Sequence, residues 1–262
     1  KKYKIKKIIH LAAQAGVRYS IENPKIYADN NILGFLNILE VSRHLKIKHL
    51  LFASTSSVYG LNSKTPFSEK HSVNHPVSFY GATKLSNEIM AHSYSHLFKI
   101  PITGLRFFTV YGPWGRPDMA LFKFVKNIIE NKKIEIYNYG NHIRDFTYIS
   151  DIVNGIILIL NSPAKIDKNW KSQKPNPASS SAPWRIYNIG NGNPVKLMDY
   201  VKEIEKKLMK KAKLKYLGIQ KGDVKKTNAD TLLLKKFFNY TPKVKIKQGV
   251  SEFVDWYLKE YL

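Results

Sequence analysis

The sequence predicts an α/β fold built on a doubly wound parallel sheet, with a smaller α/β part toward the C-terminus. Short apolar runs alternate with helical segments over the first 160 residues, which is the pattern of parallel βαβ units. Two of these runs end in polar residues, at Ser54–Ser57 and Thr109–Gly112. Because ligands bind beyond the carboxyl ends of the strands in such sheets, we expect the functional site there.

The expected elements of the first part are three strands, two helical stretches and one loop. One helical stretch follows Pro24, and the other runs from about Ser78 to Phe98. Residues 60–78 contain Gly and Pro and are expected to form a loop. The apolar runs that read as buried strands are residues 6–12, 48–55 and 102–110.

The composition changes after Leu160, and we expect a domain boundary there. Residues 161–184 are rich in Pro, Ser, Lys and Asn, which is typical of a surface excursion or a lid. A short strand at 185–191 and amphipathic helices at 197–211 and 248–262 follow. We therefore expect a sheet domain in residues 1–160 and a smaller capping part in residues 161–262.

The composition excludes several classes of protein. The chain has 262 residues of which 44% are hydrophobic, enough for an ordinary core and too many for a wholly disordered chain. No apolar run reaches the ~18–20 residues that a membrane span needs, so no membrane partner is expected. The absence of Cys excludes a disulfide scaffold, a thiolate nucleophile and a Cys-liganded metal, and no metal site is expected.

The net charge of +24 does not by itself indicate nucleic-acid binding. Lys supplies nearly all of the 43 basic residues, and the excess is spread over both halves of the chain. Proteins that recognise nucleic acids more often cluster their basic residues and favour Arg. We expect no specific nucleic-acid partner, and a diffuse attraction to anionic substrates instead.

The segment Tyr80-Gly-Ala-Thr-Lys84 is the central chemical signal. On a helix, residues four apart share a face, so the phenol and the ammonium can act together. A phenol with a pKa near 10 is a poor base at neutral pH, and a neighbouring positive charge favours the phenolate. The alternative interpretation is a half-buried Tyr beside a surface Lys.

A second motif strengthens the first. The segment Ala53-Ser-Thr-Ser-Ser-Val-Tyr-Gly60 ends a strand, although a Ser-rich turn is also common without any function. Together with Tyr80–Lys84, it resembles the UDP-glucuronate 4-epimerases of the extended short-chain dehydrogenase/reductase superfamily. Further segments that carry this resemblance are residues 10–24, 27–40, 103–122, 144–153, 181–191 and 222–230.

The resemblance implies a role for individual residues. Thr55, Tyr80 and Lys84 would be catalytic, with Thr55 bridging the substrate hydroxyl and the Tyr80 phenol. The cofactor would be NAD, and the substrate a UDP-sugar whose diphosphate meets Arg144 and whose uridine ribose meets Asp223. The cofactor-lining residues would be Ala12, Ala13, Asn30 and Phe107 beside Tyr80 and Lys84, and the residues at the sugar would be Arg18, Ser56, Ser57, Thr109 and Arg116.

The resemblance also implies a function. The chain would belong to an NAD-dependent isomerase with a Rossmann-type domain, a cytoplasmic homodimer that interconverts UDP-glucuronate and UDP-galacturonate for polysaccharide synthesis. Sugar 4,6-dehydratases need carboxyl groups at the turn where Ser56 and Ser57 stand, which favours epimerisation. Three alternatives stay open: another UDP-sugar 4-epimerase, a related decarboxylase, and a non-catalytic relative that binds nucleotide sugars.

One expected motif is not found in the sequence. The superfamily cradles the NAD pyrophosphate with a Gly-rich turn between a first strand and a helix, and the nearest run here, Gly190-Asn-Gly192, lacks the third Gly. The resemblance places Lys1 after the first βαβ units, so we expect roughly 60–80 residues before it. We therefore expect weak NAD binding, or none, by this chain alone.

Overall fold

The computed structural model describes residues 3–262 and contains a four-stranded parallel sheet. Its strand order is β1 (Lys7–His10), β2 (His49–Thr55), β3 (Ile102–Phe107) and β8 (Trp184–Ile189). The register pairs the ends of β2 and β3, Thr55 with Phe107, and the ends of β3 and β8, Phe107 with Ile189. The carboxyl ends of these strands therefore lie side by side at one end of the sheet, and the predicted α/β class is confirmed.

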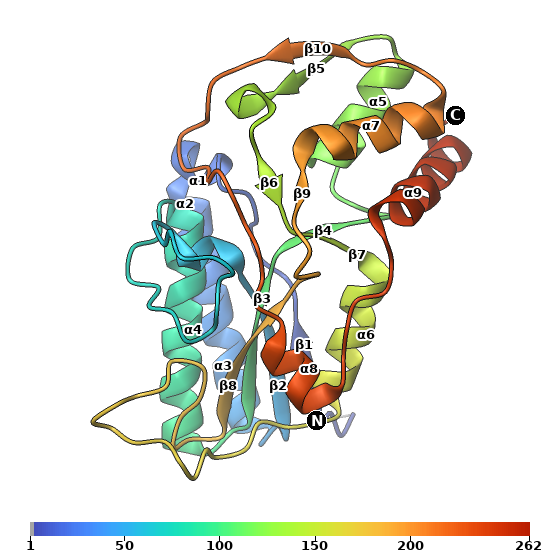
Figure 1. Cartoon of the computed structure of the whole chain (residues 1–262). Coiled ribbons are helices and arrows are strands. Elements are labelled where there is room, and N and C mark those ends of the chain that lie inside the picture. The colour runs from blue at the N-terminus through green and yellow to red at the C-terminus, as the bar shows by residue number, and fades with distance from the viewer. Residues whose placement is uncertain (1–2) are drawn as a thin grey trace.

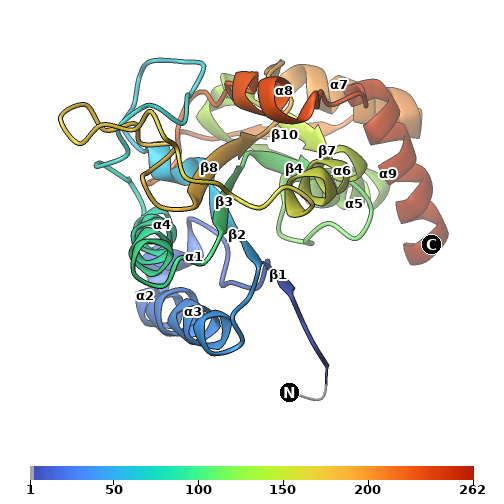
Figure 2. The same ribbon diagram turned by 90° about the horizontal axis from the view of Figure 1, so that it is seen from below.

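Helices cover both faces of this sheet (Figures 1 and 2). Helices α3 (Gly34–His44) and α4 (Phe79–Phe98) pack on one face, and α6 (Ile149–Leu160) and α8 (Leu232–Phe238) on the other. Successive side chains of a strand point to opposite faces, and β2 is apolar on both: Leu50 and Phe52 face α3, and Leu51 faces α6. A strand buried on both sides reads as a continuous apolar run, which is why the sequence located it.

A second, smaller layer of structure lies above the carboxyl ends of the strands (Figure 1). Its apolar core gathers the aromatic and aliphatic side chains of three helices and several two-stranded ladders. These elements are α5 (Ala120–Ile129), α7 (Leu197–Leu208), α9 (Ile246–Tyr261), β4 (Thr109–Tyr111) with β7 (Phe146–Tyr148), β5 (Lys133–Ile136) with β10 (Lys213–Tyr216), and β6 (Ile143–Arg144) with β9 (Val195–Lys196).

Elements from both sides of residue 160, where we expected a domain boundary, contribute to each of the two layers. Strand β8, which follows that boundary, completes the large sheet beside β3, and α5, which precedes it, packs in the smaller layer. The two parts are therefore interleaved. The segment before α3 also folds as helix, in three short pieces: α1 (Tyr19–Glu22), α2 (Pro24–Tyr27) and the π-helical turn η1 (Ala28–Leu33).

Residues 161–184 form the expected surface excursion but not a lid over the strand ends. The hydroxyl of Ser180 lies 2.7 Å from His92 Nε2, in the second half of α4. His92 is twelve residues after Tyr80, or about 18 Å along the helix axis. The excursion lies at the far end of α4 (Figure 1), because its small buried side chains, among them Ala178 and Ala182, pack there.

Candidate active site

The turn after β2 is built by the side chain of Thr55. Thr55 caps the 3₁₀ helix η2 (Ser56–Tyr59): its Oγ1 accepts a hydrogen bond of 3.1 Å from the Ser57 backbone N–H. The Thr55 hydroxyl also lies 3.2 Å from the Ser57 hydroxyl. A hydroxyl at this position satisfies a backbone donor that a helix start would leave unpaired. The turn thus presents Thr55, Ser56 and Ser57 together at the strand end, as the sequence predicted.

Helix α4 starts directly against this turn, and Gly81 makes the approach possible. A Cβ at residue 81 would lie 2.9 Å from the Ser57 carbonyl oxygen. Ser78 caps the helix by accepting a 3.0 Å hydrogen bond from the Gly81 N–H. As a result, the phenol of Tyr80 comes close enough to the Thr55 hydroxyl for that hydroxyl to lower the pKa of the phenol.

The electrostatics of Tyr80 differ from the expectation. Burial raises the pKa of the phenol, and the groups of the chain that lower it are the Thr55 hydroxyl and the Arg116 guanidinium. From the sequence, the neighbouring charge of Lys84 was expected to have this effect, and Lys84 is not among the groups that act on the phenol. Lys84 lies one helical turn further on and is 2% exposed; burial lowers the pKa of its ammonium to about 8, against the opposing effect of Glu88.

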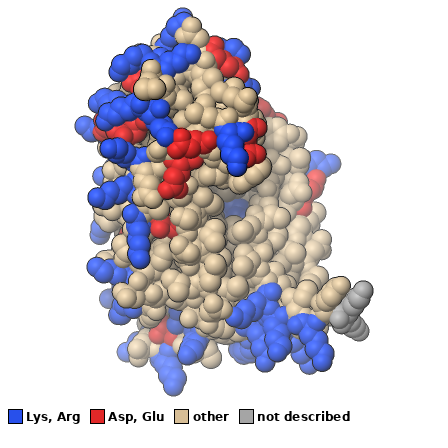
Figure 3. Space-filling view, turned by 90° about the vertical axis from the view of Figure 1, so that its right-hand side faces the viewer, with Lys and Arg blue, Asp and Glu red and all other residues tan. Residues whose placement is uncertain are grey.

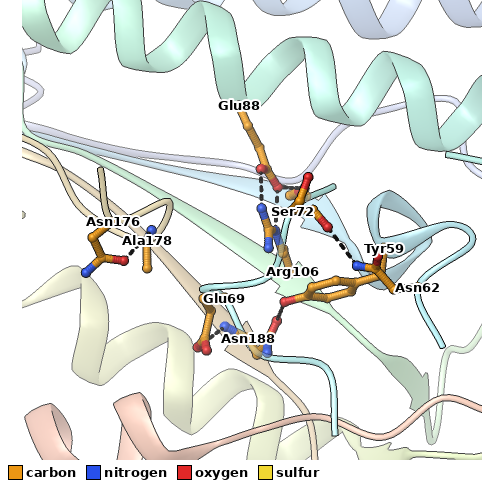
Figure 4. A network of polar contacts seen from close by, with 10 residues as sticks. Tyr59, Asn62, Glu69, Ser72, Glu88, Arg106, Asn176, Ala178 and Asn188 are labelled. Atoms are coloured by element: carbon orange, nitrogen blue, oxygen red, sulfur yellow. Dashed lines mark hydrogen bonds and ion pairs between the residues drawn. The ribbon is translucent and has the colours of Figure 1, made fainter. Parts of the chain in front are cut away.

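A buried ion pair joins α4 to β3 (Figure 4). Arg106, on β3, donates two hydrogen bonds to Glu88 on α4, at 2.9 and 2.8 Å, and the Ser54 hydroxyl donates a third at 2.6 Å. The Arg106 guanidinium also lies over the Tyr59 ring, 4.9 Å from its centroid. The network ties α4 to the strand that ends at Thr55. Sequence reasoning missed Glu88, although it stands four residues after Lys84.

The network continues to the loop before α4. The Tyr59 hydroxyl donates to Asn188 Oδ1 at 2.6 Å, and the Asn188 N–H donates to Glu69 Oε1 at 2.8 Å. Glu69 is fully buried, and burial raises the pKa of its carboxyl group to about 7. Loop 60–78 is therefore anchored to β8 by polar contacts that its Gly and Pro content did not reveal.

On the expected cofactor side, two neighbouring Asn residues point in different directions. Asn30 is exposed, and its Nδ2 bonds back to the Ile26 carbonyl at 2.8 Å. The neighbouring Asn31 is buried: it exchanges hydrogen bonds of 2.8 and 3.0 Å with the backbone of Gln14, and its Nδ2 lies 3.1 Å from the Thr83 hydroxyl. Asn31 therefore ties this segment to α4, and the cofactor role expected of Asn30 stays a prediction.

Three other residues expected at the cofactor lie at the strand ends. Ala12 and Ala13 are exposed and follow β1, whereas Phe107 is half-buried at the end of β3, in register with Thr55. These positions surround the end of the sheet that Thr55 occupies. Small side chains after β1 leave space above the strand, and the Asn31 contacts hold this segment near α4.

A second polar cluster forms in the smaller layer. Arg144 and Asp223, 79 residues apart, pair at 2.7 Å, and Arg144 also donates to the Lys225 carbonyl at 3.1 Å. His142 Nε2 lies 3.5 Å from the second Asp223 oxygen. Burial is the first cause that lowers the pKa of both His142 and Arg144. The sequence does not single out His142, because a single His outside a motif does not indicate a function.

Arg18 belongs to this second cluster. Its guanidinium stacks over the Tyr137 ring, 5.0 Å from the centroid, and its charge contributes to lowering the pKa of His142 and Arg144. Arg144 and His142 therefore meet the carboxylate of Asp223, and Arg18 lies near enough for its charge to act on both. The role at the sugar that the resemblance implies for Arg18 stays a prediction.

Thr109 and Arg116 lie between the two clusters. Thr109 is half-buried, and its N–H donates to the Asp145 carbonyl at 3.1 Å. Arg116 forms a two-point ion pair with Asp118 while its charge acts on Tyr80. The Asp145 carboxylate accepts the N–H groups of Asn191 and Gly192 at 2.7 and 2.9 Å, so this Gly turn binds an internal anion.

Among residues 3–262, no helix combines the length and apolarity of a membrane span. Within the same range, no group of three or more His, Asp or Glu side chains is placed to hold a metal ion.

Comparison with known proteins agrees with this geometry. A family model described as GDP-mannose 4,6 dehydratase matches residues 1–253. Protein CapI of Staphylococcus aureus is 56% identical over 254 residues, which cover 97% of this chain and 76% of that protein. A probable UDP-glucuronate 4-epimerase of Rhizobium meliloti is 49% identical over 255 residues, 97% of this chain and 75% of the relative.

A solved structure is also similar to this chain. The UDP-glucuronic acid 4-epimerase of Bacillus cereus, crystallised with UDP-glucuronic acid and NAD, superposes with a TM-score of 0.86 at 34% identity, over 98% of this chain and 76% of that one. The expectation of NAD as the family's cofactor is thereby confirmed. By its parallel sheet, its Thr55, Tyr80 and Lys84 arrangement and these similarities, the chain belongs to the NAD-dependent nucleotide-sugar epimerase/dehydratase family of the extended short-chain dehydrogenases/reductases.

Proposed function

We propose that the protein is a UDP-glucuronate 4-epimerase that uses NAD to interconvert UDP-glucuronate and UDP-galacturonate. The observation that carries the proposal is that α4 starts against the turn capped by Thr55, which brings the Tyr80 phenol close to the Thr55 hydroxyl, with the buried Lys84 one turn along the same helix. This arrangement offers a proton acceptor, a hydroxyl that can orient it and a cation four residues along the same helix face. It lies at the carboxyl ends of parallel strands, where such folds bind ligands.

The residues at the strand ends fit the nicotinamide half of NAD. Phe107 and the small Ala12 and Ala13 would line it, and the Lys84 ammonium would hold its ribose. NAD, when bound, takes up a hydride from carbon 4 of the sugar and returns it to the opposite face. Tyr80 accepts the proton of the carbon 4 hydroxyl, and Thr55 holds that hydroxyl and the phenol in line.

The second cluster fits the nucleotide. Arg144 and Arg18 would meet the diphosphate with planar, multi-donor groups, and Asp223 the uridine ribose. Tight binding of the UDP part by this cluster would leave the sugar free to rotate between the two hydride transfers. The short hydroxyls of Thr55 and Ser57 can hydrogen-bond to either orientation of the ring.

The choice of a uronate rests on the residues around the sugar. Oxidation at carbon 4 places a ketone next to the carbon that bears the carboxylate, and such a β-keto acid readily loses carbon dioxide. Thr109, with Arg116, Ser56 and Ser57, would hold the carboxylate so that the bond to carbon dioxide stays out of line with the carbonyl. The turn offers no carboxyl group for eliminating water, which disfavours a 4,6-dehydratase.

The direct test is the Tyr80→Phe variant of the full-length protein, assayed with UDP-glucuronate and NAD. General acid–base catalysis contributes about 10²–10⁴-fold, so turnover should fall by that factor while calorimetric substrate affinity stays near that of the parent. Tyr94→Phe, the same change fourteen residues along α4, is the matched control. Turnover of Tyr80→Phe within threefold of the parent would rule out the assignment of the base.

The same assay separates the alternatives. A pentose product would indicate a decarboxylase, and equal turnover of UDP-glucose would indicate a different UDP-sugar 4-epimerase. Binding without any turnover in the full-length protein with NAD would indicate a non-catalytic relative. The intact Thr55, Tyr80 and Lys84 favour the epimerase.

We also propose a homodimer that pairs through α4. This helix exposes Ile89 and Leu97, at 65% and 64% of their surface, two turns apart and therefore on one side of the helix. Sedimentation of the full-length protein should give twice the monomer mass, and Ile89→Glu should shift it to the monomer.

A further inference from the structure

The loop between β4 and α5, residues 112–119, brings Arg116 to the site as one half of an ion pair. Arg116 Nε lies 2.9 Å from Asp118 Oδ1, and Arg116 Nη2 lies 2.5 Å from Asp118 Oδ2. A carboxylate that takes Nε and Nη2 occupies the side edge of the guanidinium. The terminal edge, which carries Nη1 and the second hydrogen of Nη2, keeps its donors for another acceptor.

The backbone of this loop is fixed by its own hydrogen bonds. The Gly115 N–H donates to the Gly112 carbonyl and the Met119 N–H to the Arg116 carbonyl, both at 3.1 Å. Gly112 adopts a φ of 143°, which L-residues with side chains avoid. The Trp114 ring packs on Trp256 of α9, with 5.4 Å between ring centroids. Arg116 and Asp118 therefore both project from the second of two successive, locally fixed turns.

The guanidinium reaches the site while it is paired. Arg116 Nη2 is 3.5 Å from the position that a Cβ would take at Gly16, in the segment that follows β1. The charge of Arg116 acts on the phenols of both Tyr80 and Tyr27. Arg116 therefore lies against the segment that follows β1 while it is paired with Asp118, and its charge acts on Tyr80 from there.

We propose that Asp118 is a positioning residue for uronate recognition: it clamps the side edge of Arg116 so that the terminal edge faces the sugar carboxylate. The inference rests on the proposed function and adds to it a residue that determines specificity. A carboxylate held at the terminal edge is recognised by two parallel N–H donors, whereas a neutral hydroxymethyl group at the same place is not. Asp118 therefore acts on the uronate and not on the shared UDP part.

The size of the effect follows from exposure. The side chains of Arg116 and Asp118 are 44% and 57% exposed, and ion pairs as exposed as this one contribute modestly. Loss of the clamp leaves Arg116 in the site but free to adopt other rotamers. We expect KM for UDP-glucuronate to rise about two- to fivefold in Asp118→Ala, with kcat within twofold of the parent and the calorimetric affinity for UDP-glucose unchanged.

The experiment compares Asp118→Ala, Asp118→Asn and Glu40→Gln in the full-length protein with NAD. Asp118→Asn keeps one acceptor oxygen and should give an intermediate KM. Glu40 is the matched control, because it forms the same two-point pair with Arg43, at 3.1 and 2.6 Å, and contacts α4 at Tyr94, about 21 Å along the helix from Tyr80.

Two results would overturn the inference alone. Equal weakening of UDP-glucose and UDP-glucuronate in Asp118→Ala would show general damage to the loop, and a lower KM for UDP-glucuronate would show that Asp118 competes with the substrate. A parent enzyme that binds UDP-glucose as well as UDP-glucuronate would instead contradict the proposed function, and this inference with it.

Discussion

Burial determines the charge state of single residues around the site. Tyr80, Lys84 and Glu69 all have pKa values moved toward the neutral form, with desolvation as the first cause. For Tyr80 the pKa rises, for Lys84 it falls to about 8, and for the carboxyl of Glu69 it rises to about 7. The neutral form of a buried group avoids the cost of removing a charge from water.

The raised pKa of Glu69 predicts how the free energy of unfolding changes with pH. Its pKa is about 7 in the fold and 4.5 in the unfolded chain, so the folded state binds more protons between these values. Stability should therefore fall as the pH rises from 4.5 to 7, by up to about 3 kcal/mol from this group. In Glu69→Gln the difference in unfolding free energy between pH 5 and pH 8 should shrink by about that amount.

Urea unfolding at the two pH values measures this difference. Glu260→Gln, at an exposed carboxylate in α9, controls for the loss of one charge. An unchanged pH dependence in Glu69→Gln would mean that Glu69 keeps its charge in the fold.

Arg144 gives a prediction on binding. Its pairing with Asp223 and the Lys225 carbonyl orients the guanidinium. Arg144→Ala should lose a charge-assisted contact with UDP worth roughly 1.5–3 kcal/mol, which is about a 10- to 150-fold weaker Kd, and should release free 4-keto sugar during turnover. Calorimetry and product analysis measure the two effects, with Arg43→Ala as the control. Unchanged affinity without released keto sugar would argue against a role at the diphosphate.

At the scale of elements, the decisive contact is between the start of α4 and the turn η2. Both the Ser57 carbonyl and Pro76 approach the place where a Cβ of residue 81 would be, at 2.9 and 3.3 Å. The backbone carbonyl is not free to move, since Thr55 caps the same turn. The distance from Tyr80 to Thr55 thus depends on a residue without a side chain.

Gly81→Ala should therefore push α4 away from the turn. We expect kcat to fall at least tenfold, because small misplacements of reacting groups cost about 10²-fold, while the far-UV CD spectrum stays that of the parent. Gly218→Ala is the control, since a Cβ there meets nothing within 4 Å. Full activity in Gly81→Ala would show that α4 and η2 adjust without cost to the site.

At the scale of the whole molecule, a buried polar network and four apolar clusters among the described residues connect segments that are distant in sequence. Arg106 and Glu88 lie at the centre of the network, and their side chains are 2% and 5% exposed. On the side of α6 and α9, charged side chains gather at the top, along the left edge and at the bottom of Figure 3, and a broad uncharged area fills the middle.

We expect substitutions of Arg106 and Glu88 to have non-additive effects on the free energy of unfolding. Arg106→Met leaves the Glu88 carboxylate buried without its partner, and breaking such a pair costs about 3–5 kcal/mol. The double variant Arg106→Met with Glu88→Leu removes both charges and should recover most of that loss. Chemical denaturation of the parent, both single variants and the double variant measures the coupling. Additive losses in the double variant would show that the two charges act independently.

The sequence by itself determined the fold class, the polar turn after β2 and the helix that carries Tyr80 and Lys84. Those features are local: apolar runs define buried strands, and a four-residue spacing defines a helix face. It also identified Arg144 and Asp223, through long motifs that carry the family resemblance. Only the tertiary structure decided which groups meet, because a contact such as Arg144 with Asp223 joins residues 79 positions apart.

The tertiary structure also decided the direction of side chains and the pKa values. It turned Asn31 inward and Asn30 outward, and placed Arg18 with the second cluster. It showed that Thr55 and Arg116, and not Lys84, lower the pKa of Tyr80. These features depend on burial and on long-range packing, which no local pattern encodes, since the same Lys, Glu or Asn is equally compatible with the surface until its neighbours exclude water.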